Sequence, residues 1–250
     1  MKKVLSFDID NTLNEPKMPI TPEIAELLAA LSQKFIIAPI SGQKFDQFLI
    51  QIIDELPEDT NFANFKLFPG QGTQFYEYEN GEFSRKYNYA LKENQVREIS
   101  SALETAAREN GAWYADAQND DPIENRESMV AFSPLGQHAG VDAKKAWDPD
   151  MKKREKIAKR AKELAPEFDF EIAGTTTINA FVPGRNKAFG MEKLMENLGF
   201  AKNDILYFGD MTQPGGNDFP VKNMGIETIT VRDFRETANV LRGILATVLE

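Results

Sequence analysis

Phe7-Asp8-Ile9-Asp10-Asn11-Thr12-Leu13 follows an apolar run, Val4 to Phe7, that turns abruptly acidic. The pattern predicts a buried strand with two acids at its carboxyl end. Carboxylates at positions i and i+2 of an extended backbone point the same way, so Asp8 and Asp10 would project together. Two close negative charges need a cation, and Mg²⁺ takes oxygen ligands and tolerates shared carboxylates. The free amides of the following loop can also receive an anion. The alternative is an ordinary turn, since Asp and Asn are common turn residues.

Three later stretches supply the other parts that a carboxylate nucleophile attacking a phosphate requires. A second apolar run, Ile36 to Ile40, ends in Ser41-Gly42. Gly184-Arg185-Asn186-Lys187 places a lysine at the start of a helical segment. A third apolar run ends in acid within Leu206-Tyr207-Phe208-Gly209-Asp210-Met211-Thr212-Gln213-Pro214-Gly215-Gly216-Asn217-Asp218. A hydroxyl, an ammonium group and further carboxylates therefore follow the first motif in this order.

The four motifs together resemble those of the haloacid-dehalogenase (HAD) superfamily of phosphoryl-transfer enzymes. The shared pattern is DxDxT, then Ser-Gly, then Lys, then GDxxxxGGND, and it spans essentially the whole chain. A Phe-Gly-Asp followed by Pro-Gly-Gly-Asn-Asp is similar to the phosphomannomutase branch, whose members carry an inserted type IIB cap. Ser-Gly or a single Lys would carry no weight alone, whereas four motifs in the correct order are jointly specific.

The composition narrows the class of protein. The chain has 250 residues, 42% of them hydrophobic, which is enough to bury a full core as one large domain or two smaller ones. The absence of cysteine excludes disulfides, thiolate metal ligands and a cysteine nucleophile. The net charge of -10 argues against a nucleic-acid partner, because binding a polyanion needs a basic face. No signal region precedes the first strand and no apolar run is long enough to span a bilayer, so we expect a cytoplasmic protein with no membrane partner.

The order of the predicted elements indicates an α/β fold. Strands are expected at residues 4–7, 34–40, 205–208 and 228–231, with helices between them, the first beginning at Thr21-Pro22. This alternation predicts a doubly wound, Rossmann-like parallel sheet. Ligands of such sheets bind beyond the carboxyl ends of the strands, which is where Asp8, Ser41 and Asp210 fall.

An α+β cap is expected to interrupt this core. The spacing of the apolar residues changes after residue 65, and Asn80-Gly81 predicts a hairpin. Helices are then expected over residues 93–110 and 150–164, with strands at residues 113–115, 129–133 and 178–182. We therefore predict a discontinuous phosphotransferase core, residues 1–85 and 185–250, and a substrate-specificity cap, residues 86–184.

The resemblance assigns roles to the residues at matching positions. Asp8 would attack phosphorus to form an aspartyl phosphate, and Asp10 would protonate the leaving oxygen and later deprotonate the incoming one. Mg²⁺ is the implied cofactor, held by the Asp8 carboxylate, the Asp10 main-chain carbonyl and Asp210. The implied phosphate ligands are the Lys187 ammonium, the Ser41 hydroxyl and the main-chain N–H groups of Asp10-Asn11 and Gly42. Asn217 and Asp218 are the implied partners of Lys187 and of waters on the metal.

The likeness to phosphomannomutases weakens in the cap. Those enzymes present cap arginines to the phosphate that lies away from the nucleophile. Arg126 keeps the first of these, but Gln137 and Lys144 stand where the family has arginine. Neither amide nor ammonium replaces a bidentate guanidinium.

The remaining candidate substrate residues lie in the last cap strand. Thr177 and Asn179 stand where the family has a sugar-contacting Ser-x-Asp, so the cap set is Arg126, Gln137, Thr177 and Asn179. His138, the single histidine, is interpreted as a loop residue.

These substitutions favour a Mg²⁺-dependent phosphatase acting on a small phosphorylated metabolite, such as a sugar phosphate. The alternative is a phosphomannomutase or other hexose-phosphate mutase. A non-catalytic binding module on the same fold is a third interpretation, disfavoured because Asp8, Asp10, Lys187 and Asp210 are all present. The protein is expected to be a monomer or a homodimer formed through the cap.

Overall fold

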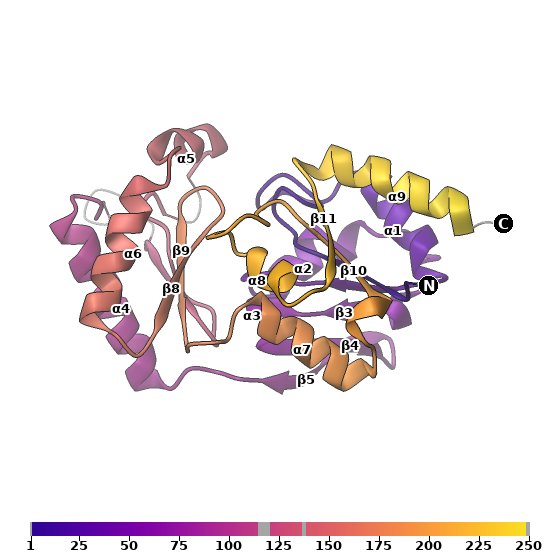
Figure 1. Ribbon diagram of the computed structural model, residues 1–250, viewed down its shortest axis with the longest axis horizontal. Helices are drawn as coiled ribbons and strands as arrows, with labels where there is room; N and C mark the ends of the chain where they lie inside the picture. Colours follow the sequence, from indigo (N-terminus) through magenta and orange to yellow (C-terminus); the bar gives the residue numbers. More distant parts are fainter. Residues whose placement is uncertain (1, 115–120, 137–138, 249–250) are drawn as a thin grey trace. The chain divides into compact units, whose positions relative to one another are not determined.

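The computed structural model describes residues 2–114, 121–136 and 139–248. The chain forms two compact units (Figure 1). The core unit comprises Met1–Asn88, Asn186–Pro214 and Asp218–Glu250, and the cap unit comprises Tyr89–Arg185 with Gly215–Asn217. The boundaries predicted from the sequence lie after residues 85 and 184.

The core unit is built on a parallel sheet of four strands. These are β1 (Val4–Phe7), β2 (Ile36–Pro39), β10 (Ile205–Gly209) and β11 (Glu227–Thr230), in the spatial order β11-β10-β1-β2. Val4 pairs with Ile36 on one side and Ile205 on the other, so β1 is central and buried. All the strands run the same way, and their carboxyl ends therefore meet at one edge.

Helices cover both faces of this sheet, because successive residues of each buried strand point to opposite sides. Leu5, Phe7, Leu206 and Phe208 belong to one apolar cluster, with α1 (Pro22–Ser32), α2 (Phe45–Gln51) and α9 (Phe234–Val248). Val4, Ile205 and Tyr207 belong to the other, with α7 (Lys187–Leu198) and α8 (Phe219–Asn223). The predicted doubly wound α/β architecture is confirmed.

A three-stranded antiparallel sheet extends the core unit. It consists of β3 (Lys66–Leu67), β4 (Gln74–Glu79) and β5 (Glu82–Asn88), and single bridges connect its start to the edge of the parallel sheet near β2. Asn80 and Gly81 both have positive φ, as a two-residue hairpin turn requires, and the predicted hairpin is confirmed. The short helix α3 (Pro69–Gly72) precedes β4. It packs against α7, where a Cβ on Gly72 would lie 2.2 Å from Gly190 Cα.

The cap unit is an antiparallel sheet with helices on one face. The strands β6 (Ile123–Asn125), β7 (Val130–Phe132), β8 (Asp169–Ala173) and β9 (Thr177–Phe181) lie in the order β6-β7-β9-β8. Ile178 and Ala180 pack with α4 (Glu93–Glu109) and α6 (Lys152–Leu164), whereas Thr177 and Asn179 alternate onto the opposite face. The unit also contains α5 (Val141–Trp147).

The sequence predicted the cap less well than the core. Trp113 and Tyr114 are not in a strand, and Ala115 lies outside the described residues. The Trp113 ring instead stacks at 6.1 Å on Phe132, so this apolar stretch is a packed loop. Strands β6 and β8 were not expected. Each lies at an edge of its sheet, where one face is not fully covered and the apolar signal is weak.

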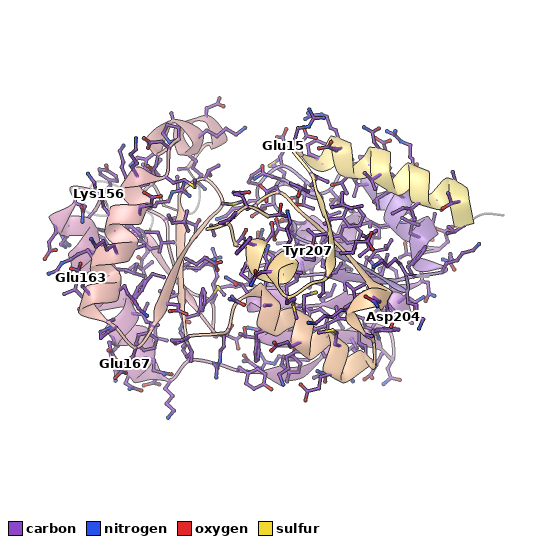
Figure 2. All side chains as sticks on the ribbon, viewed as in Figure 1. Glu15, Lys156, Glu163, Glu167, Asp204 and Tyr207 are labelled. Carbon is purple, nitrogen blue, oxygen red and sulfur yellow. The ribbon has the colours of Figure 1, made fainter. Side chains whose placement is uncertain are left out.

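A buried ion pair connects several parts of the cap unit. Arg154 and Asp148 are each 2% exposed, and the Arg154 Nε lies 2.9 Å from Asp148 Oδ2. Asp148 also accepts from the backbone N–H groups at the start of α6, and the Arg154 guanidinium donates to the Gly174 carbonyl in the β8–β9 turn. By contrast, Lys156 and Glu163 project from the exposed side of α6 (Figure 2). Among the described residues, no helix is both long and apolar enough to cross a membrane.

Candidate active site

The carboxyl edge of the parallel sheet gathers the polar residues that the motifs single out. Asp8 follows β1, Ser41 follows β2 by two residues, and Asp210 follows β10 directly. The Asp8 backbone N–H donates to the Phe208 carbonyl at 2.9 Å, which continues the ladder up to the acid. Asp8 and Ser41 are each only 5% exposed.

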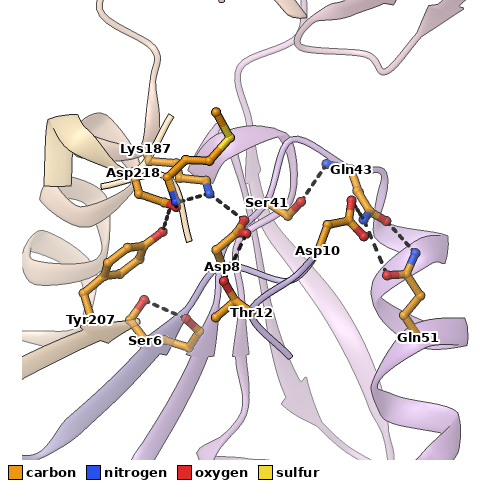
Figure 3. A network of polar contacts seen from close by, with 12 residues as sticks. Ser6, Asp8, Asp10, Thr12, Ser41, Gln43, Gln51, Lys187, Tyr207 and Asp218 are labelled. Carbon is orange, nitrogen blue, oxygen red and sulfur yellow. Dashed lines mark hydrogen bonds and ion pairs between the residues drawn. The ribbon is translucent and has the colours of Figure 1, made fainter. Parts of the chain in front are cut away.

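Lys187 reaches this edge from the first position of α7. Asn186 begins the helix, its side chain accepting from the Ala188 N–H at 3.0 Å. The Lys187 side chain is fully buried, and its Nζ donates to Asp8 Oδ1 at 2.5 Å and to Asp218 Oδ1 at 2.6 Å (Figure 3). One ammonium group therefore links two carboxylates that are 179 and 31 positions away from it in the sequence.

Asp218 is held on several sides. Its Oδ1 also accepts from the Tyr207 hydroxyl at 2.5 Å, and its Oδ2 accepts from the Met211 N–H at 3.0 Å. A Cβ on Gly209 would lie 2.5 Å from Asp218 Oδ2, so the glycine of Phe-Gly-Asp leaves the space that this carboxylate fills. Asp218 thus anchors Lys187.

The cluster has more negative than positive charge, and the pKa values of Asp8, Lys187 and Asp210 are shifted. Burial raises the pKa of Asp8 well above its ordinary value; Lys187 opposes this shift, while Asp218 and Asp210 add to it. Burial by itself would lower the pKa of Lys187, but the carboxylates of Asp218 and Asp8 outweigh burial and raise it. Burial and then Asp218 raise the pKa of Asp210 to about 6. Three carboxylates facing one ammonium favour a further cation.

The donor set fits Mg²⁺. One carboxylate oxygen from each of Asp8, Asp210 and Asp218 lies within 4.8 Å of the others. Hard oxygen ligands in this number suit Mg²⁺, which usually keeps several waters. The Asp218 carboxylate accepts from Lys187, Tyr207 and the Met211 N–H, whereas Asp8 Oδ2 accepts a long hydrogen bond of 3.4 Å from Thr12, so Asp8 and Asp210 are the more available direct ligands. Asn11, expected to bind phosphate, donates its side chain to Asp210 and its N–H to the Asn14 carbonyl.

Asp10 lies beside a different set of partners. Its Oδ1 accepts from the Lys17 N–H at 2.9 Å, and its Oδ2 accepts from Gln43 Nε2 at 2.8 Å. The Ser41 Oγ accepts from the Gln43 N–H at 3.3 Å, so Gln43 contacts both a predicted phosphate ligand and the predicted acid–base residue. Gly42 lies between Ser41 and Gln43 in the same loop.

The predicted cap residues within the described part of the chain differ in their contacts. Arg126 is buried, and its Nε donates to Glu124 Oε2 at 2.7 Å. Thr177 shares a 3.2 Å hydrogen bond with the Ser133 hydroxyl. Asn179 is 3% exposed, and its Oδ1 has no hydrogen-bond partner within the described part of the chain.

Two further predicted site residues are Asn217, which directly precedes Asp218, and Gln137. The buried Oδ1 of Asn217 likewise lacks a partner in residues 2–114, 121–136 and 139–248. Gln137 and His138 are outside those ranges.

Four residues of the site were missed from the sequence: Asn14, Gln43, Gln51 and Tyr207. Gln51 carried a signal in the sequence, because it is a polar residue three positions after Phe48, on the same face of α2. In the structure its side chain is fully buried. Tyr207 looked like any other residue of an apolar strand, and its hydroxyl gains meaning only from the position of Asp218.

Comparisons with known proteins agree with this architecture. A family model described as "Eukaryotic phosphomannomutase" matches residues 24–246, which begins after Asp8 and Asp10. A phosphomannomutase from Babesia bovis is 25% identical over 98% of this chain and 99% of its own length. Phosphomannomutase 2 of Dictyostelium discoideum is 27% identical over 87% of this chain and 85% of its own. Among solved structures, a haloacid dehalogenase-like hydrolase from Bacteroides thetaiotaomicron aligns over 98% of this chain and all of its own, with TM-score 0.63 and 17% identity.

Proposed function

Because the chain belongs to the eukaryotic phosphomannomutase family, a branch of the HAD superfamily of phosphotransfer enzymes, we propose that it is a Mg²⁺-dependent hexose-phosphate mutase of the phosphomannomutase type. The names of the relatives support this activity better than the phosphatase favoured by the cap substitutions. The core unit would perform the phosphoryl transfer and the cap unit would select the substrate.

The observation that carries the proposal is the Asp8–Lys187–Asp218 cluster. In the first step an Asp8 oxygen forms a bond to phosphorus while the bond from phosphorus to the sugar oxygen breaks, and Asp10 gives that oxygen a proton. In the second step the free hydroxyl of a bound hexose monophosphate attacks the aspartyl phosphate, which forms the sugar bisphosphate. Asp10 takes the proton of that hydroxyl, and the bond between phosphorus and Asp8 breaks. After the bisphosphate reorients, its other phosphate is transferred back to Asp8 as in the first step.

The other residues would bind and orient the phosphoryl group. Lys187 contacts Asp8 directly, so its positive charge lies next to the position that the transferred phosphate would occupy. Ser41 and the Gly42 N–H would contact the phosphoryl oxygens from the neighbouring strand end. Mg²⁺, held by Asp8, Asp210 and the Asp10 carbonyl, would neutralise charge on the carboxylates and the phosphoryl oxygens when bound.

Phosphate release is the second candidate activity, and a specific observation favours it. A mutase must retain a sugar bisphosphate while the sugar reorients, which needs strong cationic contacts in the cap. Arg126 is already paired with Glu124, and Gln137 and Lys144 stand where the family has arginine. Each charge-assisted hydrogen bond contributes about 1.5–3 kcal/mol, so weaker retention would let water attack the aspartyl phosphate.

Time-resolved ³¹P NMR on mannose 1-phosphate and glucose 1-phosphate, with Mg²⁺ and a sugar bisphosphate activator, separates the two activities. The proposal expects stoichiometric conversion to the 6-phosphate. Release of inorganic phosphate with little 6-phosphate would overturn it in favour of the phosphatase. The cytoplasmic location and the monomer or cap-mediated dimer stay predictions.

A further inference from the structure

The side chain of Asp10 is held at both carboxylate oxygens. One oxygen accepts from the backbone N–H of Lys17. The other accepts from the carboxamide of Gln43 (Figure 3). The first contact needs no particular side chain, because it comes from the loop backbone. The second depends on which end of the Gln43 amide faces Asp10, since an amide oxygen there would repel a carboxylate.

Buried hydrogen bonds set that orientation. Gln43 Oε1 accepts from Gln51 Nε2 at 2.7 Å, which turns Gln43 Nε2 toward Asp10. Gln51 Oε1 in turn accepts from Asn14 Nδ2 at 3.0 Å. The same Asn14 Nδ2 donates to the carbonyl of Met18, an atom that can only accept. The direction of donation is therefore defined for every hydrogen bond in the series, from the Met18 carbonyl to Asp10. This direction is called the polarity of the series.

These amides are shielded from water. Asn14 and Gln51 are fully buried and Gln43 is 6% exposed. A buried amide without partners is costly, so Gln43 and Gln51 have a strong preference for the orientation that pairs them, whereas Asn14 uses Nδ2 for two acceptors and its buried Oδ1 has no partner in the described part of the chain. Gln51 also donates to Gln47 Oε1 at 3.0 Å, which adds a second acceptor to its Nε2.

We propose that the Asn14–Gln51–Gln43 amide relay positions Asp10 for proton transfer, and that its polarity as well as its presence is required. The inference rests on the proposed function in one respect, the role of Asp10 as acid–base. Gln43, Gln51 and Asn14 are positioning residues, because they act through Asp10. Their loss should slow the step that needs Asp10 and spare a step that does not.

p-Nitrophenyl phosphate separates the two kinds of step. When an Asp8 oxygen bonds to phosphorus, p-nitrophenolate leaves as an anion without needing a proton. Breakdown of the aspartyl phosphate by water does need Asp10, which takes a proton from the water as the bond from phosphorus to Asp8 breaks. The water oxygen bonds to phosphorus, and the electron pair of the broken bond returns to the Asp8 carboxylate. Inorganic phosphate then leaves.

The first variant is Gln43→Met, which keeps the length of the side chain and removes the amide. With Mg²⁺ and p-nitrophenyl phosphate, rapid mixing should show p-nitrophenolate formation within about twofold of wild type. The steady-state rate should fall about tenfold, a part of the 10²–10⁴-fold that acid–base catalysis contributes. Acid-quenched enzyme should therefore carry more phosphoenzyme than wild type.

The second variant, Gln51→Glu, tests polarity without touching Asp10. A glutamate at 51 still accepts from Asn14 but cannot donate to Gln43, whose amide would turn its oxygen toward Asp10. The same kinetic split is expected. Gln33→Met is the matched control, because Gln33 is exposed and donates instead to the Asp59 carbonyl, and it should behave as wild type.

Two results would overturn the relay. One is a wild-type steady-state rate in both relay variants, with folding verified by circular dichroism. The other is an equal fall in formation and breakdown of the phosphoenzyme, which would indicate a general structural defect. If Gln43→Met fails to fold, Gln51→Glu decides. Because p-nitrophenyl phosphate is not a sugar, the split is measurable even when the NMR experiment rejects the mutase, so the two failures are distinguishable.

Discussion

The two units each bury an ion cluster, and the clusters differ in charge balance. In the cap unit, Arg154 and Asp148 form a neutral pair, and backbone groups of α6 and the β8–β9 turn satisfy the remaining atoms. In the core unit, Lys187 faces Asp8 and Asp218, with Asp210 close by. The cap cluster is neutral and is called the closed cluster below. The core cluster has two more negative charges than positive and is called the open cluster.

The pKa values follow this difference. Burial opposes ionisation of Asp148, yet hydrogen bonds from Arg154 and from backbone N–H groups outweigh it and lower the pKa. The pKa values of Asp8 and Asp210 are raised instead, because burial and neighbouring carboxylates act together. A neutral buried pair needs no further ion, whereas a cluster with excess negative charge favours the binding of a cation, or of an anionic substrate bridged by a cation.

Asp8→Asn should have the largest effect, because it removes the proposed nucleophile while reducing the excess charge. We expect kcat to fall on the order of 10⁴-fold or more. The metal-free protein should unfold at a temperature equal to or above that of wild type, because like-charge repulsion decreases. Turnover assays and thermal unfolding measure the two effects. Retention of more than a trace of the wild-type rate, with contamination excluded, would contradict the aspartyl-phosphate mechanism.

Arg154→Met tests the closed cluster, because it leaves Asp148 buried without its counter-charge. Breaking a buried pair costs about 3–5 kcal/mol of unfolding free energy. Both tryptophans, Trp113 and Trp147, lie in the cap unit, so urea denaturation followed by tryptophan fluorescence reports on it.

Lys152→Met is the matched control for Arg154→Met. Lys152 pairs with Asp150 on the surface, and little change in stability is expected. Replacing both members of the buried pair, Arg154→Met with Asp148→Leu, should recover part of the loss. Equal stability of Arg154→Met and Lys152→Met would show that the buried pair has no special weight.

The pH dependence of the metal-free protein should reveal the open cluster. A shift in the pKa of Asp210 from 3.8 to about 6 means that the folded state binds more protons than the unfolded state between these values. Stability should therefore fall as pH rises from about 4 to about 7, by up to about 3 kcal/mol.

Urea denaturation followed by circular dichroism across this range gives the slope. Asp210→Asn should flatten it, and Mg²⁺ should oppose the loss because it binds the ionised carboxylates. A slope in Asp210→Asn equal to that of the wild type would assign the effect to other groups.

Tyr207→Phe should have the smallest effect, since it removes one hydrogen bond to Asp218 and no charge. Hydrogen bonds to charged groups contribute about 1.5–3 kcal/mol, and neutral ones about 0.5–1.5 kcal/mol. Tyr87→Phe is the comparison, because the Tyr87 hydroxyl donates to the neutral Gly72 carbonyl at 2.9 Å. Urea midpoints should rank Tyr207→Phe below Tyr87→Phe. The reverse order would mean that the charge on Asp218 adds nothing to that bond.

The amino-acid pattern alone specifies the architecture of the core and which polar side chains meet at one edge of its sheet. Apolar runs with the period of buried strands, separated by helical patterns, specify a parallel sheet, and a parallel sheet brings the ends of its strands to one edge. The proximity of Asp8, Ser41 and Asp210 is therefore predictable from the sequence alone. The cap was less predictable, because short edge strands such as β6 carry little apolar signal.

How these side chains are held depends on the three-dimensional packing of the chain. Asp8 and Lys187 are 179 positions apart, and Gln43 contacts Asp10 across 33. No local pattern encodes which end of a carboxamide faces a carboxylate, or that the Tyr207 hydroxyl donates to Asp218. Those choices arise when packing excludes water, because each buried donor must then find an acceptor among whatever groups the fold has brought near it.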